Sequence, residues 1–61
     1  MATVLIHLKD GTTDEFNGVE GRSAAAVELA VGQNDCGRLR LLGRWYDRED
    51  IASVRVVGHD G

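Results

Sequence analysis

Apolar and polar residues alternate in the first stretch of the chain, as they do in a strand with one buried face. Val4, Ile6 and Leu8 fall on one face of this stretch, and the other face holds Thr3, Leu5, His7 and Lys9. The pair Asp10-Gly11 follows, and Asp-Gly between two β-prone runs is typical of a two-residue type I′ turn, which needs positive φ at both central positions. The pattern therefore predicts strands at 3–9 and 12–19 joined in a hairpin, with Phe16 as the core residue of the second strand.

A second alternating stretch predicts a strand at 38–46. Its inward positions are Leu39 and Leu41, with Arg38 and Arg40 facing outward. Gly43 allows a bulge or bend within this strand. The polar segment 47–50 predicts a tight or 3₁₀ turn, and the β-branched residues of 51–57 predict a final strand. The segment 59–61 is expected to form a short tail that frays.

The segment between these two halves fits either a helix or a strand. As a helix over 23–31, it starts with Ser23 as its N-cap and stops just before Gly32. As a strand over 25–31, it alternates valine and leucine with Glu28 and alanine, and a turn-rich connection leads to the next strand. The strand interpretation accounts for more of the neighbouring sequence, so we prefer it.

The sequence therefore predicts an all-β domain, either a small antiparallel five-strand sheet or an SH3-like barrel. The predicted strands cover residues 3–9, 12–19, 25–31, 38–46 and 51–57. The alternative is an α+β fold in the order ββαββ, with a helix at 23–31. Because the two folds differ in helix content, circular dichroism distinguishes them.

Length and composition indicate one domain spanning residues 1–61. A core of this size buries only about 60% of the unfolded surface and cannot be divided further. Cys36 is the only cysteine, so hydrophobic packing has to stabilise the fold without an internal disulfide. The longest mostly apolar stretch, 24–31, is shorter than the roughly 20 residues that span a bilayer. Since the N-terminus also differs from a signal peptide, we expect a cytoplasmic protein without membrane contact.

The charge of the chain bears on its partners. The formal net charge is −3, which argues against a dedicated nucleic-acid binder because phosphate contacts demand a basic surface. The charge is unevenly distributed, however. Residues 1–37 hold two basic and six acidic residues, whereas residues 38–61 hold five arginines and four acidic residues.

Two stretches of the chain resemble parts of small β-barrels. The opening Val4-Leu-Ile-His-Leu-Lys-Asp-Gly-Thr-Thr13 resembles the first hairpin of Sm-like and SH3-like barrels, and Trp45-Tyr-Asp-Arg-Glu-Asp-Ile-Ala-Ser-Val54 resembles their turn into a last strand. The chain is also similar to short uncharacterised proteins of actinobacteria and their phages, which combine an early Asp-Gly hairpin with a late Asp-Ile/Val-x-x-Val strand. This resemblance implies a small β domain of a phage-related kind. The Asp/Asn positions with which Sm proteins grip RNA have no counterpart here, so RNA binding is not implied.

The candidate binding residues lie on the predicted strand 38–46. They are Arg38, Arg40, Arg44 and Tyr46, together with the neighbouring Trp45. The first four have even numbers and therefore share one face of a continuous strand. Guanidinium groups beside aromatic rings hold phosphates or stack on bases. A solvated strand face whose arginines pair with Glu28, Asp47 or Glu49 is the other interpretation, and the charge balance favours it.

A second apolar face is predicted on the side opposite the main core. Within their predicted strands, Leu5, Leu42 and Val57 lie on the face opposite the main apolar residues. In so small a sheet, such a face usually covers another subunit. Trp45, the single tryptophan, is a natural core or interface residue. These features motivate a homodimer hypothesis.

No residue pattern indicates catalysis or a cofactor. His7, His59 and Cys36 lack the spacing of a zinc site, and the glycines form no phosphate-binding loop. A chain that spends its apolar residues on one core has little left for a water-excluding cleft. We therefore expect a non-enzymatic protein-interaction module with an unknown protein partner. The alternatives are a weak nucleic-acid-binding protein that uses the arginines of strand 38–46, and a structural homo-oligomer.

Overall fold

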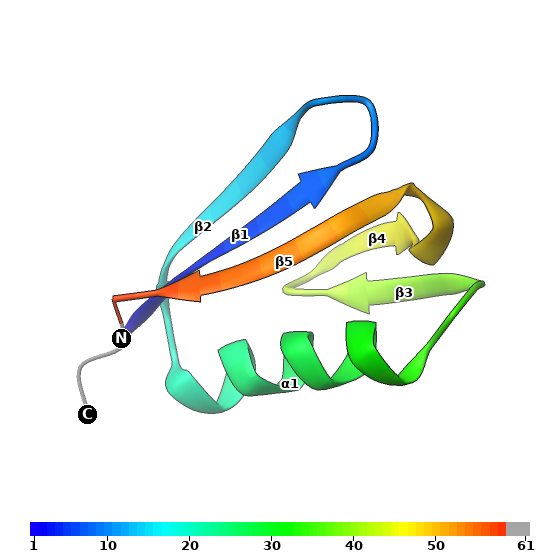
Figure 1. Cartoon of the computed structure of the whole chain (residues 1–61). Coiled ribbons are helices and arrows are strands. Elements are labelled where there is room, and N and C mark those ends of the chain that lie inside the picture. The colour runs from blue at the N-terminus through cyan, green and yellow to red at the C-terminus, as the bar shows by residue number, and fades with distance from the viewer. Residues whose placement is uncertain (59–61) are drawn as a thin grey trace.

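The computed structural model describes residues 1–58; the predicted tail, including His59, lies outside the described residues. The elements in chain order are β1 (Ala2–Leu8), β2 (Thr13–Val19), α1 (Gly21–Gln33), β3 (Arg38–Leu41), β4 (Arg44–Asp47), the 3₁₀ helix η1 (Arg48–Asp50) and β5 (Ile51–Val57). Figure 1 shows these elements with α1 running along one side of the strands. The expected 3₁₀ turn after the fourth strand is confirmed.

The strands form two antiparallel sheets. One sheet has the order β2-β1-β5 and the other consists of β3 and β4. In the larger sheet, Thr3 near the start of β1 lies opposite Val57 at the end of β5. The first and last strands of the chain are therefore neighbours. The prediction of a β-rich domain is confirmed. The prediction of one five-strand sheet or SH3-like barrel is wrong, because the described strands divide into two sheets that do not close into a barrel.

The segment predicted as a strand at 25–31 is part of a helix, and the element order is ββαβββ. Residues 24, 27 and 31 of α1 are buried, and this i, i+3, i+7 spacing places them on one helix face. Those residues are Ala24, Val27 and Val31. A strand at this position would instead have put every second residue inside. Packing of this stripe against the sheets therefore decides in favour of the helix.

The ends of α1 differ from those expected for a helix over 23–31. The N-cap is Glu20, without a side-chain hydrogen bond, so Ser23 lies inside the helix rather than at its cap. At the other end, Gly32 is also helical, and Asn34 closes the helix by donating from Nδ2 to the carbonyl of Ala30 at 2.7 Å. The helix is therefore longer at both ends than its strongest sequence signals indicate.

The β1–β2 hairpin is confirmed, but its turn is not the expected two-residue type I′ turn. The Gly11 N–H donates to the Leu8 carbonyl at 3.1 Å, and the Leu8 N–H donates to the Thr12 carbonyl at 2.9 Å. Within this turn, only Gly11 has positive φ, at 94°. This arrangement is a three-residue loop with a left-handed glycine at its last position. The Asp10 side chain accepts hydrogen bonds from the side chain and N–H of Thr12, which lower its carboxyl pKa.

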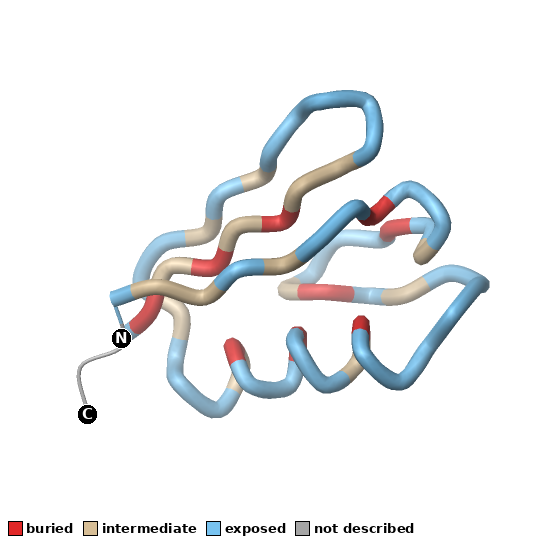
Figure 2. Tube along the Cα trace, viewed as in Figure 1, coloured by how far each residue is buried: buried red, intermediate tan, exposed pale blue. Residues whose placement is uncertain are grey.

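The hydrophobic core lies between the larger sheet, α1 and the inner side of the β3–β4 hairpin. Figure 2 shows the buried positions on β1 and on the side of α1 that faces the strands. The core residues are Ala2, Val4, Ile6, Ala24, Val27, Val31, Leu41, Tyr46 and Ile51, and Phe16 packs against them. The inward alternation predicted for the first strand is therefore confirmed. Among residues 1–58, no helix is long and apolar enough to cross a membrane.

Arg48 joins three parts of the fold. Its Nε donates to the carbonyl of Val31 at 3.0 Å and to that of Asn34 at 2.8 Å, both at the end of α1. Its Nη1 donates to the carbonyl of Ile51 at 3.2 Å. Because the last carbonyls of a helix have no partners within the helix, and a positive charge is favourable at this end, Arg48 serves as the C-terminal cap of α1 and fixes it to β5.

Candidate functional site

The stretch predicted as one strand at 38–46 is a hairpin of two strands. The turn between them consists of Leu42 and Gly43, whose φ angles are 52° and 82°, and Leu41 lies directly opposite Arg44. Positive φ at both central positions is the signature of a type I′ turn. The sequence signal for this turn, a leucine before a glycine, is weak because leucine rarely adopts positive φ.

The hairpin divides the predicted binding residues between its two faces. Residues directly opposite each other in an antiparallel pair share a face. The opposing pairs are Arg38 with Asp47, Leu39 with Tyr46, Arg40 with Trp45, and Leu41 with Arg44. Arg38, Arg40 and Trp45 therefore lie together on the outer face, whereas Arg44 and Tyr46 lie on the inner face with the core leucines. The predicted common face of all four parity-matched residues is wrong, because the turn reverses the chain within the segment.

The two inner residues connect the hairpin to the larger sheet. Tyr46 is only 9% exposed, and its phenol donates a hydrogen bond of 2.7 Å to Asp14 Oδ2 on β2. Arg44 Nη1 lies 3.6 Å from the same carboxylate oxygen, and the Arg44 guanidinium lies 6.0 Å from the centre of the Phe16 ring. Burial raises the pKa of Tyr46 to about 12, and its hydrogen bond to Asp14 acts in the same direction. This phenol stays protonated near neutral pH and serves the structure.

The outer residues form an exposed surface, which we name the hairpin face and define as Arg38, Arg40 and Trp45. The Trp45 side chain is 59% exposed, and the Arg38 guanidinium lies 5.2 Å from the centre of its ring, within cation–π range. Within residues 1–58, no carboxylate forms an ion pair with Arg38 or Arg40. Both arginines are exposed, as expected for a solvated strand face, but the expected pairing with Glu28, Asp47 or Glu49 does not form within these residues. Their N–H groups remain open to an external acceptor.

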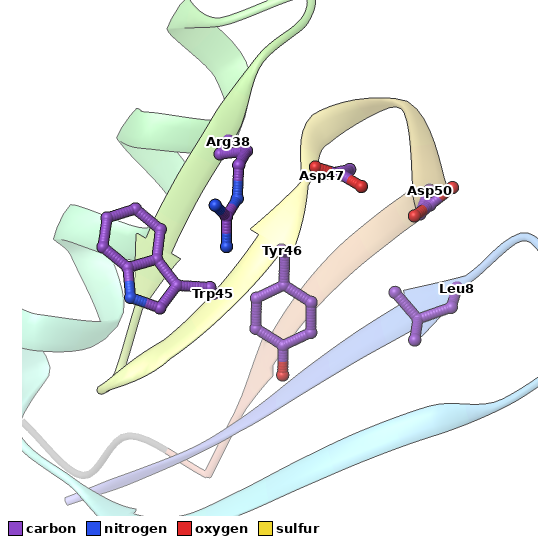
Figure 3. A pocket seen from close by; sticks show the side chains of 6 residues that line it. All are labelled: Leu8, Arg38, Trp45, Tyr46, Asp47 and Asp50. Carbon is purple, nitrogen blue, oxygen red and sulfur yellow. The ribbon is translucent and has the colours of Figure 1, made fainter.

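A shallow pocket of about 190 Å³ adjoins the hairpin face. Figure 3 shows the residues that line it, which are Leu8, Arg38, Trp45, Tyr46, Asp47 and Asp50. In this view the Arg38 guanidinium lies between the Trp45 and Tyr46 rings, which leave β4 in different directions. Apolar surface, one cation and two carboxylates surround the pocket, but no serine, cysteine or histidine does. The pocket provides apolar and charged contacts for a ligand.

A larger groove of about 360 Å³ lies between α1 and β3, and we name it the helix groove. It is lined by Ser23, Ala26, Val27, Ala30, Arg40, Leu41 and Leu42. The helix side is open because serine and alanine have small side chains. Arg40 belongs to both the hairpin face and the helix groove, so the two surfaces are continuous. The sequence interpretation missed this groove because it treated the helical segment as a strand.

The second apolar face predicted from Leu5, Leu42 and Val57 does not form. Leu5 and Val57 lie on the outer side of the larger sheet, where their row neighbours are polar or charged: Glu15 and Arg55 beside Leu5, and Thr3 beside Val57. Leu42 lies in the β3–β4 turn instead and packs against the core. Of the two features that motivated the homodimer hypothesis, this apolar face is absent from residues 1–58, whereas Trp45 is exposed.

The remaining candidate residues do not assemble into a site. The His7 ring nitrogen Nδ1 lies 3.0 Å from the hydroxyl of Thr13 on the neighbouring strand, and Cys36 is exposed in the loop before β3. No three histidine, cysteine, aspartate or glutamate side chains within the described residues are grouped to hold a metal ion. The hairpin face and the helix groove therefore remain as candidate binding surfaces.

Asp14 and Arg48 position the hairpin, and the sequence interpretation assigned neither of them a role. For Asp14 a signal was available, since it shares the parity of Phe16 and therefore the inner side of β2. For Arg48 no signal was available, because all of its partners are main-chain carbonyls. In comparisons with known proteins, no family model, curated protein or solved structure matches this chain.

Proposed function

We propose that this protein is a non-enzymatic protein-interaction module that contacts its partner through the hairpin face. The observation that carries the proposal is an exposed tryptophan, Trp45, with the Arg38 guanidinium over its ring and Arg40 directly opposite. Neither arginine forms an ion pair within residues 1–58. The neighbouring Arg44 and Arg48 make contacts within the fold. Arg38 instead contacts the exposed Trp45 ring, and Arg40 makes no ion pair within residues 1–58.

Tryptophan and arginine are the residues expected at the centre of a protein interface. They are enriched among the few interface residues that dominate binding energy. Trp45 offers a large apolar surface with a polar N–H at its edge, and Arg38 restricts the orientation of this ring before any partner arrives. An anchor that is already ordered loses less conformational entropy on binding. This arrangement supports a protein partner with an apolar contact for Trp45 and acceptors for the arginines.

A nucleic-acid partner is the second possibility, since arginine and tryptophan also hold single strands. The overall charge of −3 works against it, because the affinity of such binders comes chiefly from unopposed positive charge. Asp47 lies on the same outer face as Arg38, and Asp50 lines the adjoining pocket. Carboxylates at these positions repel a phosphate backbone. The same experiment tests both partners.

The experiment is capture from a lysate of the native host on immobilised protein, before and after nuclease treatment. The wild type is compared with Trp45→Ala and with the double variant Arg38→Gln/Arg40→Gln. Arg55→Gln is the control, because Arg55 is an exposed arginine on the larger sheet, opposite Leu5 on its outer side. We expect at least one protein that the wild type and the control retain after nuclease treatment and that both hairpin-face variants lose. Equal retention by all four proteins, or a loss of every captured protein on nuclease treatment, contradicts the proposal.

A further inference from the structure

We infer that the partner presents an acidic segment with a central aliphatic side chain, which enters the helix groove while flanking carboxylates bind Arg40 and Arg38. This inference rests on the proposed function and names the chemistry of the partner. Arg40 carries the connection, because it lies on the hairpin face opposite Trp45 and also lines the groove. A segment that contacts Trp45 and Arg40 therefore reaches the groove without crossing another surface.

The groove has the size and lining of a side-chain pocket. Its volume of about 360 Å³ lies at the lower end of the range for small-molecule sites, which suits one or two side chains. Val27, Leu41 and Leu42 form apolar walls, and Ala26 and Ala30 keep the helix side low. An aliphatic side chain buried there gains the free energy of removing apolar surface from water.

Large exposed apolar side chains flank the groove on both sides. Leu29 is 59% exposed and lies three residues after Ala26, which places the two on neighbouring positions of one helix side. Trp45, also 59% exposed, lies across β3 from the groove, opposite Arg40. Single exposed apolar residues are common on protein surfaces, but these two lie on elements at either side of the groove, where an occupant of the groove can contact them.

The charges around the groove favour an acidic occupant. Arg40 lies at its β3 side, and Arg22 lies four residues before Ala26, on the same helix side. The nearest helix carboxylate in sequence, Glu28, lies two residues after Ala26 and hence about 200° around the helix. A second copy of this chain would bring the same arginines against each other, which is unfavourable. Carboxylates from a different chain complement them.

The backbone of Leu42 gives a further reason to assign a role to the groove. Leu42 has a φ of 52° and is the only residue other than glycine with positive φ among residues 1–58. A left-handed conformation is unfavourable for a residue with a branched side chain, and asparagine suits this position of a type I′ turn. Strain of this kind points to function at the strained residue. The Leu42 side chain supplies one apolar wall of the groove in return.

The test uses capped hexapeptides and the fluorescence of Trp45, the single tryptophan of the chain. One set has a central Leu-Leu pair flanked by Asp and Glu, and matched sets replace the flanks with Lys or Ser, or the central pair with Ala-Ala. We expect the acidic leucine peptides to bind tightest, with a loss of about tenfold or more on replacing the leucines. Equal or tighter binding of the basic or neutral peptides overturns the inference, and so does indifference to the central pair.

Two variants change the groove, and their folding is checked by circular dichroism before binding is measured. Ala26→Leu fills the groove with a good helix former, and Ala25→Leu is its matched control, since Ala25 is an exposed alanine on the same helix outside the groove. Leu42→Asn removes an apolar wall and relieves the turn. We expect Ala26→Leu and Leu42→Asn to weaken binding of the acidic leucine peptides about tenfold and Ala25→Leu to leave it unchanged. Unchanged binding in all three variants overturns the inference.

The two proposals fail in different ways. If lysate capture depends on Trp45 but is the same for wild type and Ala26→Leu, the protein-interaction function stands and the groove is not its partner's site. If capture depends on neither, the proposed function fails as well. Binding of a single-stranded oligonucleotide that competes with the acidic peptides and collapses as salt increases replaces both proposals with nucleic-acid binding.

Discussion

The phenol of Tyr46 donates a hydrogen bond of 2.7 Å to Asp14, a residue on the opposite sheet. This contact fixes which side of the β3–β4 hairpin faces the protein. Since Tyr46 and Trp45 are adjacent and point to opposite faces of β4, holding Tyr46 against β2 turns Trp45 toward solvent. A two-stranded hairpin has little stability by itself, so this connection is what presents the hairpin face in one orientation.

The pH dependence of folding should report this contact. The folded chain retains the Tyr46 proton up to a pKa of about 12, compared with an ordinary value of 10.0. Because the unfolded chain then loses its proton first, the stability from this group is complete below pH 10 and is lost as the pH rises toward 12. We expect the phenolate absorbance of the single tyrosine to appear near pH 12 in the folded protein. Tyr46→Phe is the control, and a midpoint near pH 10 in the wild type contradicts the contact.

Arg48 should be the arginine that contributes most to stability. Its guanidinium donates to three main-chain carbonyls, those of Val31, Asn34 and Ile51. Hydrogen bonds from charged groups contribute roughly 1.5–3 kcal/mol, so Arg48→Ala should lower the free energy of unfolding by about 2–3 kcal/mol. Arg48→Lys should recover little of this, since an ammonium group lacks the planar arrangement of donors. Urea unfolding measures the loss, and Arg22→Ala is the control with an expected change within about 0.5 kcal/mol.

Two glycines should respond to alanine in opposite directions. Gly32 lies within α1, and a Cβ there would meet no atom within 4 Å. Gly32→Ala should therefore stabilise the protein by about 0.8–1 kcal/mol through helix propensity. Gly37 has a φ of 92°, so Gly37→Ala should destabilise it by roughly 1–2 kcal/mol. Thermal unfolding of both variants measures these changes. A loss of stability in Gly32→Ala would mean that α1 ends before this residue.

The first turn of α1 should be open to improvement. Glu20 occupies the N-cap with an extended backbone but makes no side-chain capping bond. Aspartate keeps the negative charge near the helix N-terminus and is short enough to accept from the first free N–H groups. We expect Glu20→Asp to raise the free energy of unfolding by about 1 kcal/mol. Glu28→Asp, in the middle of the helix, should give no gain, and an equal gain in both variants would falsify the assignment of Glu20 as the cap.

The sequence predicted best those elements in which local pattern and tertiary packing agree. In β1, Val4 and Ile6 were assigned to the inner face of an extended strand, and both are completely buried in the structure. In α1 the local pattern was ambiguous. The apolar residues Val27 and Val31 fit both a two-residue and a helical period over so short a stretch, and only packing against the sheets selects the helix.

The hairpin face could be predicted only in part. Arg38, Arg40 and Trp45 were among the candidates, but their grouping with Arg44 and Tyr46 required an unbroken strand. The turn that separates them depends on Leu42 in a conformation that its side chain disfavours. Because leucine disfavours this turn conformation, the sequence predicted one continuous strand. Arg44, Trp45 and Tyr46 were therefore each assigned to the wrong face relative to Arg38 and Arg40.

The pairing of Thr3 with Val57 brings the beginning and the end of the described fold to one edge of the molecule. A domain whose first and last strands end next to each other can be inserted into a surface loop of a host protein with short linkers at both junctions. We also expect it to tolerate a circular permutation that joins these ends and opens the chain at the exposed turn around Gly11. Either rearrangement leaves the β3–β4 hairpin and its groove untouched, which makes the fold a convenient carrier for grafted recognition surfaces.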